Sequence, residues 1–130
     1  MLLTFSRKEF ETLIKQGVKI HTIRQDKHNR WKPGRKIHFW LGNPRNVKKH
    51  PYQFGEGKCT DVAFIEIFPK KNMVRISYDG VNYGTFCKIQ ELNELAVDDG
   101  FTNWEHMKEW FSEDFKGKMI FWKSLNCVWL

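Results

Sequence analysis

Cysteine is scarce in this sequence, and its three copies lie far apart. Cys59, Cys87 and Cys127 form no Cys-x-x-Cys pair. An odd number of widely spaced cysteines argues against the disulfide framework of a small secreted domain, and zinc sites need closely spaced ligands. We therefore expect three reduced, mostly buried thiols, no metal and no cofactor.

Long hydrophobic runs are also missing. No apolar stretch approaches the roughly 18 residues that a membrane helix needs. The first residues, MLLTFSRKEF, lack the basic start and the apolar stretch of a signal peptide. With 130 residues, 41% of them hydrophobic, the chain has the size and composition of one globular domain spanning residues 1–130. We expect a cytoplasmic monomer that does not associate with membranes.

Acidic residues are almost absent between residues 15 and 50, where Asp26 is the only one. The same segment carries many basic residues, namely Lys15, Lys19, Arg24, Lys27, Arg30, Lys32, Arg35, Lys36, Arg45, Lys48 and Lys49. Residues 91–114 reverse this pattern, with eight acidic residues against Lys108 alone. A net charge of +7 distributed in this way offers a positive face to a polyanion, and nucleic acid is the usual one. The alternatives are solvated charged faces, or a protein partner for the acidic segment.

The hydrophobic pattern predicts the order β-α-β-β-β-β-α-α-β. Strands are expected at residues 2–5, 18–24, 36–41, 62–68, 73–78 and 119–123, and helices at 6–16, 89–96 and 102–116. In the last helix, Trp104, Met107, Phe111 and Phe115 fall on one side and Gly117 follows its end. This order favours an α+β fold, with a small mixed β-barrel and helices packed on it.

Residues 42–57, GNPRNVKKHPYQFGEG, contain two prolines and three glycines and are expected to form a long loop. A loop of this length in a small domain is either disordered or functional. We expect Asn43, Arg45, Lys48 and Lys49 to contact a nucleic acid, because basic side chains neutralise phosphates. Stacking on unpaired bases is expected from Trp31, and Tyr52 and Phe54 are further candidates. Core packing is the alternative for these aromatic residues, and Trp104, Trp110 and Trp122 are expected in the core.

The stretch KIHTIR, which begins at Lys19, holds the candidate site residues. In an extended strand, Thr22 and Arg24 share one face, while Ile23 points from the other face into the core. Lys19 would then lie on the face of Ile23, unless the chain bends near residues 18–20. Gly17 favours such a bend, so the convergence of Lys19, Thr22 and Arg24 depends on an irregular start of the strand.

If these side chains converge, their chemistry is specific. The Arg24 guanidinium suits a phosphate or a carbonyl-like oxygen. A lysine that is partly desolvated beside an arginine has a lowered pKa, so Lys19 could act as a base toward the Thr22 hydroxyl. The alternative is an exposed strand with ordinary surface side chains.

Four motifs together resemble the ASCH domain family. They are K-I-H-T-I-R, W-K-P-G-R-K-I, L-N-E-L-A-V-D-D-G-F and W-E-H-M-K-E-W-F, and the resemblance continues to FKGKMIFWKSL. It implies a PUA-like fold, a small β-barrel with flanking helices, with a cleft that takes RNA or a nucleoside. One branch of the family is an amidohydrolase acting on N4-acetylcytidine, and its lysine base and threonine nucleophile match Lys19 and Thr22.

The acidic position of that branch falls on Val97, which cannot donate a proton, so Asp98 or Asp99 would have to take its place. The function expected from residues and resemblance together is binding of RNA or a nucleotide-like ligand in a basic cleft. An N4-acetylcytidine amidohydrolase and a ribonuclease are the alternatives.

Overall fold

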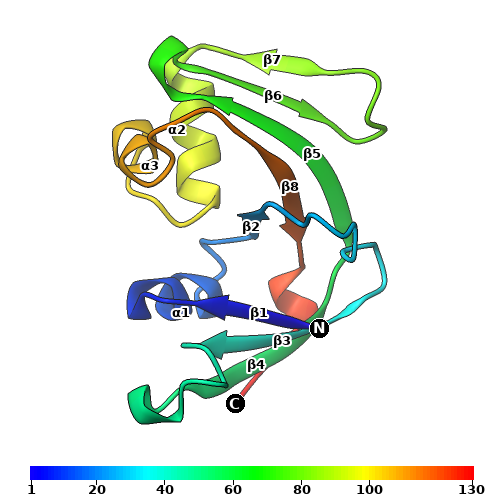
Figure 1. The fold of residues 1–130 in the computed structure, drawn as a ribbon, viewed down its shortest axis with the longest axis vertical. Helices are drawn as coiled ribbons and strands as arrows, with labels where there is room; N and C mark the ends of the chain where they lie inside the picture. Colours follow the sequence, from blue (N-terminus) through cyan, green and yellow to red (C-terminus); the bar gives the residue numbers. More distant parts are fainter.

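The computed structural model describes residues 1–130, which form nine β-strands and three α-helices (Figure 1). In chain order these are β1 (Leu2–Phe5), α1 (Lys8–Lys15), β2 (His21–Arg24), β3 (Lys36–Leu41), β4 (Tyr52–Lys58), β5 (Asp61–Phe68), β6 (Met73–Ser77), β7 (Gly84–Phe86), α2 (Ile89–Asp98), α3 (Trp104–Trp110), β8 (Phe115–Phe121) and β9 (Val128–Trp129). Three short 3₁₀ helices lie at Val47–Lys49, Pro69–Lys71 and Ser124–Asn126.

The strands belong to two sheets. One has the order β1-β3-β4-β9 and the other has the order β2-β8-β5-β6-β7. Only β1 and β3 pair in parallel; every other pair is antiparallel. The expected α+β class is confirmed, but the expected closed barrel is wrong. β1 and β2 are edge strands of different sheets, and a side chain, that of Arg24, joins them where a barrel would have a backbone ladder.

Alternating burial along the strands builds the core. In β5, the side chains of Ala63, Ile65 and Ile67 are fully buried, as their spacing of two predicts. Ile37 and Phe39 do the same in β3. These residues belong to a core of 22 buried hydrophobic residues. This core fixes the two sheets in place, and the site residues project from their strands.

The helices are short and cover the sheets from one side. Figure 1 shows α2 and α3 beside the five-stranded sheet and α1 beside β1. The indole N–H of Trp104 donates to Asn72 Oδ1 at 2.9 Å, which fastens α3 to the turn between β5 and β6. None of the helices has the length and hydropathy that crossing a bilayer requires.

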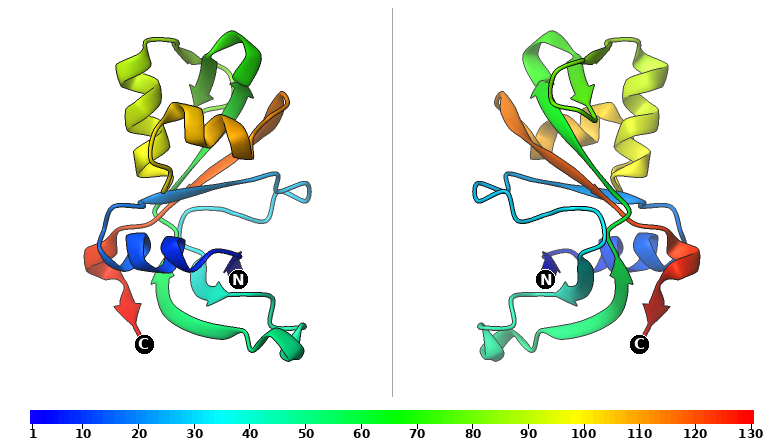
Figure 2. Two further views of the ribbon diagram at one scale, coloured as in Figure 1. Left: turned by 90° about the vertical axis from the view of Figure 1, so that its left-hand side faces the viewer. Right: turned by 90° about the vertical axis from the view of Figure 1, so that its right-hand side faces the viewer.

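The expected loop at residues 42–57 is wrong in its second half, where β4 pairs with β3 along its length. The glycines of this segment suggested a loop, but Gly55 and Gly57 lie in β4, where neighbouring side chains leave no room for a Cβ. A Cβ at Gly55 would lie 2.4 Å from the Trp129 ring, and one at Gly57 would lie 2.5 Å from Cys127 Sγ. The remaining connection, residues 42–51, lies at the opposite end of the molecule from α2 (Figures 1 and 2).

The third helix is shorter than expected. It ends at Trp110, and Phe115 and Gly117 belong to β8, where they pair with Ile67 and Ile65 of β5. Gly117 is needed because a Cβ there would lie 2.5 Å from the carbonyl oxygen of Arg24. A glycine that looked like a helix terminator thus allows β2 to pass close to β8.

Candidate functional site

The chain enters β2 through an irregular segment, as the convergence of the site residues required. Gly17 has a φ of +78°, which glycine adopts without strain. The backbone N–H of Lys19 donates to Leu13 O, and that of Ile20 donates to Asp98 O at 2.9 Å. Lys19 therefore precedes the regular strand, and its side chain is free to turn toward Thr22 and Arg24.

Lys19, Thr22 and Arg24 line one cavity of about 330 Å³. It lies where the edge strands β1 and β2 approach each other, with α3 and the end of β3 completing the wall. Its polar lining consists of Thr4, Ser6, Lys19, Thr22, Arg24, Asn43 and Asp99. Its apolar lining consists of Phe5, Phe10, Ile23, Phe101, Trp110 and Phe111, with Gly42 at the end of β3.

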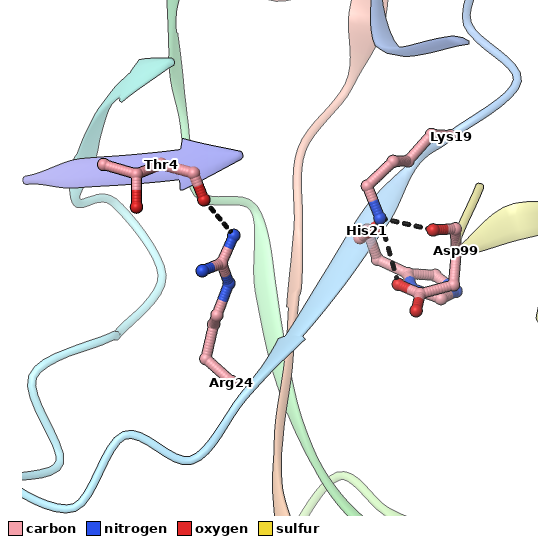
Figure 3. A network of polar contacts seen from close by, with 5 residues as sticks. All are labelled: Thr4, Lys19, His21, Arg24 and Asp99. Carbon is pink, nitrogen blue, oxygen red and sulfur yellow. Dashed lines mark hydrogen bonds and ion pairs between the residues drawn. The ribbon is translucent and has the colours of Figure 1, made fainter. Parts of the chain in front are cut away.

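The Lys19 ammonium is buried and fully engaged in hydrogen bonds (Figure 3). It donates to His21 O at 2.9 Å, to the Asp99 carbonyl oxygen and to Asp99 Oδ1 at 3.2 Å. An ammonium has three donors, so none remains for the Thr22 hydroxyl. The side chains of Lys19 and Asp99 are only 3% and 4% exposed. The expected base is therefore one half of a buried ion pair.

Burial lowers the pKa of Lys19 below its ordinary value of 10.5, the ion pair with Asp99 opposes that shift, and the nearby Arg24 charge adds to it. Two aromatic rings compensate for part of the lost hydration, since the ammonium lies 5.0 Å from the ring centre of Phe10 and 5.7 Å from that of Phe5. Gly100 leaves room for this side chain, because a Cβ there would lie 2.8 Å from Lys19 Cδ.

His21 completes the network and was not expected in the site. Its Nδ1 lies 3.0 Å from Asp99 Oδ1, and the ring packs against Phe121 at 5.1 Å. A carboxylate only accepts hydrogen bonds, so Nδ1 carries the hydrogen. The sequence did hold a signal: a histidine on the core face of a predicted strand needs a buried polar partner. Which acidic residue supplies it could not be read from the strand.

Arg24 bridges the two edge strands. Its Nη2 donates to Thr4 O at 2.7 Å (Figure 3). Its Cζ lies 5.1 Å from the ring centre of Phe5. Nε is buried without a partner, and Nη1 makes no hydrogen bond within the protein. The Thr22 hydroxyl also lacks a protein partner. The Nη1 donors of Arg24 and the Thr22 hydroxyl therefore retain hydrogen-bonding capacity toward a ligand.

The remaining candidates fall into three places. Asn43 lines the cavity, whereas Arg45, Lys48 and Lys49 are exposed along the 42–51 connection and do not line it. Trp31 is 6% exposed and belongs to the core, so the expected stacking of a base on its ring does not fit its position. Phe54 is buried in the same core.

The two candidate acids, Asp98 and Asp99, lie in different places. Asp99 lines the cavity, whereas Asp98 lies with Val97 in a different, shallow hollow. Burial raises the pKa of Asp98, but this carboxyl group does not face the cavity that contains Thr22. Of the two, only Asp99 is placed to act there.

Trp110 is the residue most clearly misjudged from the sequence. Trp104 and Trp122 are buried as expected, but Trp110 is 46% exposed and lines the cavity. Its ring meets Phe10 edge to face at 5.8 Å, and the Arg7 guanidinium lies 5.3 Å from its centre. Six positions after Trp104, a helical residue lies about 240° around the axis and therefore off the buried side of Trp104 and Met107, and α3 ends at Trp110.

No group of three or more histidine, cysteine, aspartate or glutamate side chains is placed to hold a metal ion. The polar lining of the cavity is a lysine, an arginine, a carboxylate, hydroxyls and an amide. Comparison with known proteins gave no match among family models, curated proteins or solved structures.

Proposed function

We propose that this chain is an ASCH-like domain that binds single-stranded RNA, or a nucleotide-like ligand, with a base in the cavity between β1 and β2. The observation that supports this proposal is the set of free hydrogen-bonding groups in that cavity. Arg24 and Thr22 have unused capacity and lie among aromatic side chains. This combination of a few polar groups with an apolar wall is typical of small-ligand sites.

The dimensions and the lining suit a planar heterocycle. A volume of about 330 Å³ lies at the lower end of the range for ligand pockets, where a single base with its sugar fits better than a longer segment. Trp110, Phe101 and Phe111 supply aromatic surface on one side. Bases of single-stranded RNA stack on such rings and are read through hydrogen bonds at their edges.

The phosphates of an RNA would lie outside the cavity. Asn43 lines it, and the same connection continues into Arg45, Lys48 and Lys49, which are exposed. Basic side chains beside the opening can neutralise the phosphates that flank a bound base, with release of counterions. Affinity should therefore fall steeply as salt is raised.

The test is binding of a fluorescein-labelled single-stranded RNA octamer, measured by anisotropy at several salt concentrations. Arg24→Ala should weaken binding at least about tenfold, because it removes contacts to the base. The double variant Lys48→Ala, Lys49→Ala should reduce the salt dependence by about one unit of slope per lost phosphate contact.

A matched control for the lysine pair exists in the same chain. Lys70 and Lys71 also lie in a 3₁₀ helix that ends in a left-handed residue, but neither lines the cavity and neither belongs to the 42–51 connection. Lys70→Ala, Lys71→Ala should leave affinity almost unchanged. Absence of detectable binding to the RNA octamer and to mononucleotides at moderate salt would contradict the proposal. The recovered RNA, run on a denaturing gel, tests the ribonuclease alternative.

An amidohydrolase is the second candidate, because the Thr22 hydroxyl, a lysine with a lowered pKa and the Asp99 carboxylate share the cavity. A neutral Lys19 would take the proton of Thr22 as its hydroxyl attacks the acyl carbon, and Asp99, which is hydrogen-bonded to Lys19, would relay that proton to the leaving amine. Water would then hydrolyse the acyl group from Thr22. The hydrogen bonds of Lys19 favour binding over this chemistry, since all three of its donors are engaged. Incubation with N4-acetylcytidine, followed by chromatography for cytidine, decides. Turnover that is retained in Thr22→Ser and lost in Thr22→Ala would support the enzyme, and no turnover by the unaltered protein would remove it.

A further inference from the structure

The two carboxylate oxygens of Asp99 have different surroundings. Oδ1 accepts hydrogen bonds from Lys19 and His21, whereas Oδ2 accepts none from the protein. Figure 3 shows the carboxylate with one oxygen joined to this network and the other free. A carboxylate oxygen can accept two hydrogen bonds, so Oδ2 is an unused acceptor.

This free oxygen is not sealed inside the protein. The polar side-chain atoms that are sealed in the protein without a partner are Arg24 Nε and Trp122 Nε1, and Asp99 Oδ2 is not among them. Asp99 lines the cavity, although the residue as a whole is 3% exposed. From these two observations we infer that Oδ2 faces the space in which a ligand would lie.

Lys19 and His21 fix the carboxylate in this orientation. They approach Oδ1 at 3.2 Å and 3.0 Å, and both side chains are buried. An ionised oxygen with little access to water gains most from a ligand group that donates a hydrogen bond, and it repels an anion. Arg24 offers donors in the same cavity, so the cavity presents an acceptor at Asp99 and donors at Arg24.

We propose that Asp99 is a specificity-determining residue that selects a base by an N–H group on its edge, while Lys19 and His21 are positioning residues that hold Oδ2 toward the ligand. This inference rests on the proposed function. It assigns the base to the cavity, with its N–H at Asp99 and a carbonyl or ring nitrogen at Arg24. It also places the phosphates outside, beside the 42–51 connection.

Nucleosides in which the edge N–H is replaced by methyl groups test the proposal directly. The pairs are uridine with 3-methyluridine, cytidine with N4,N4-dimethylcytidine, and adenosine with N6,N6-dimethyladenosine, each titrated calorimetrically into the unaltered protein. For the nucleoside that binds best, the methylated partner should bind about 10- to 100-fold more weakly, as expected for loss of a charge-assisted hydrogen bond. Equal binding of both members of that pair would overturn the proposal without any variant.

Asp99→Asn reverses the hydrogen-bonding character of the free position. Its carbonyl oxygen can still accept from Lys19 and His21, and its amide then presents donors to the cavity. The preference for the unmethylated nucleoside should fall to about threefold or less. A preference as large as that of the unaltered protein would show that Asp99 does not read the edge, and would overturn the assignment.

The role of His21 is tested by the ratio of the affinities for the unmethylated and the methylated nucleoside, rather than by affinity alone. His21→Asn keeps an N–H donor near the place of Nδ1 and should retain most of the discrimination. His21→Phe removes the donor and should lose it. Equal discrimination in the two variants would overturn the positioning role. Failure of every nucleoside and of RNA to bind would instead refute the proposed function itself, so the two failures are distinguishable.

Discussion

Removal of one partner from the Lys19–Asp99 ion pair should destabilise the protein far more than removal of both. Asp99→Ala leaves a buried ammonium whose only acceptors are the backbone carbonyl oxygens of His21 and of residue 99, and Lys19→Met leaves a buried carboxylate with His21 as its only donor. Because a buried charge without its partner keeps its desolvation penalty, loss of one partner costs about 3–5 kcal/mol. Natural domains have total stabilities of about 5–15 kcal/mol, so each single variant should lose a large part of its free energy of unfolding.

The double variant carries no unpaired charge at this position. We expect it to be more stable than either single variant, which gives an interaction energy of at least about 3 kcal/mol between the two residues. The exposed pair Lys70–Glu113 is the control, with a distance of 3.4 Å but side chains that are 77% and 79% exposed. Its interaction energy should be about 0–1 kcal/mol, because water screens the two charges.

Urea denaturation followed by circular dichroism measures the free energy of unfolding of all members of both cycles. Asp99→Asn adds an intermediate point, because it loses the charge but keeps an acceptor for Lys19. If the Lys19 and Asp99 substitutions were additive, or if their interaction energy equalled that of the surface pair, the pair would not be a buried ionic unit.

Two further predictions concern the frame around the site. Gly55→Ala should lower the free energy of unfolding by about 1–3 kcal/mol, because its Cβ would lie 2.4 Å from the Trp129 ring. Gly84→Ala is the control and should change stability little, because its Cβ would have its nearest neighbour at 3.6 Å. Equal free energies of unfolding for the two variants in urea titrations would contradict this. Burial acts to raise the pKa of Asp26, but hydrogen bonds from two backbone N–H groups and from Lys118 outweigh it and hold the pKa below 3.8. Since the folded pKa is the lower one, this stabilisation is complete above the unfolded pKa and is lost as the pH falls through the folded value. Asp26→Asn should therefore be less stable at pH 7 and lose less stability below pH 4 in thermal melts, and parallel curves for the two proteins would contradict the role of the carboxylate.

Local periodicity was sufficient for much of the frame. The alternation in KIHFWL predicted β3, and the run VAFIEIF predicted β5. Phe10, Leu13 and Ile14 were expected to form the apolar stripe of the first helix, and in α1 Phe10 and Ile14 are buried while Leu13 is half-buried. The faces of β2 followed in the same way, once Gly17 was taken as the place of a bend. These features depend on neighbours in the sequence, which is why the sequence contains them.

Features that depend on distant contacts could not be predicted in this way. Gly55 and Gly57 looked like loop residues because the C-terminal residues that pack over them are far along the chain. Asp99 could not be matched to Lys19, because 80 positions separate them and the two lie in segments of opposite charge. The open seam between β1 and β2 has the same origin, since an edge strand is defined by the partner it lacks.

The meeting of these two charged segments changes how the basic face should be understood. Lys19 belongs to the basic segment, but Asp99 of the acidic segment neutralises it inside the protein. Of the cations in the cavity, only Arg24 then remains unpaired by a carboxylate, and attraction of a polyanion falls to the exposed side chains of the 42–51 connection. Substitutions in the ion pair should therefore change stability and the choice of base, whereas substitution of Lys48 and Lys49 should change the salt dependence of binding and leave stability unaltered. If substitutions in the ion pair changed the salt dependence of binding as the substitution of Lys48 and Lys49 does, the phosphates would have to enter the cavity. The free oxygen of Asp99 opposes such a position, because it repels an anion.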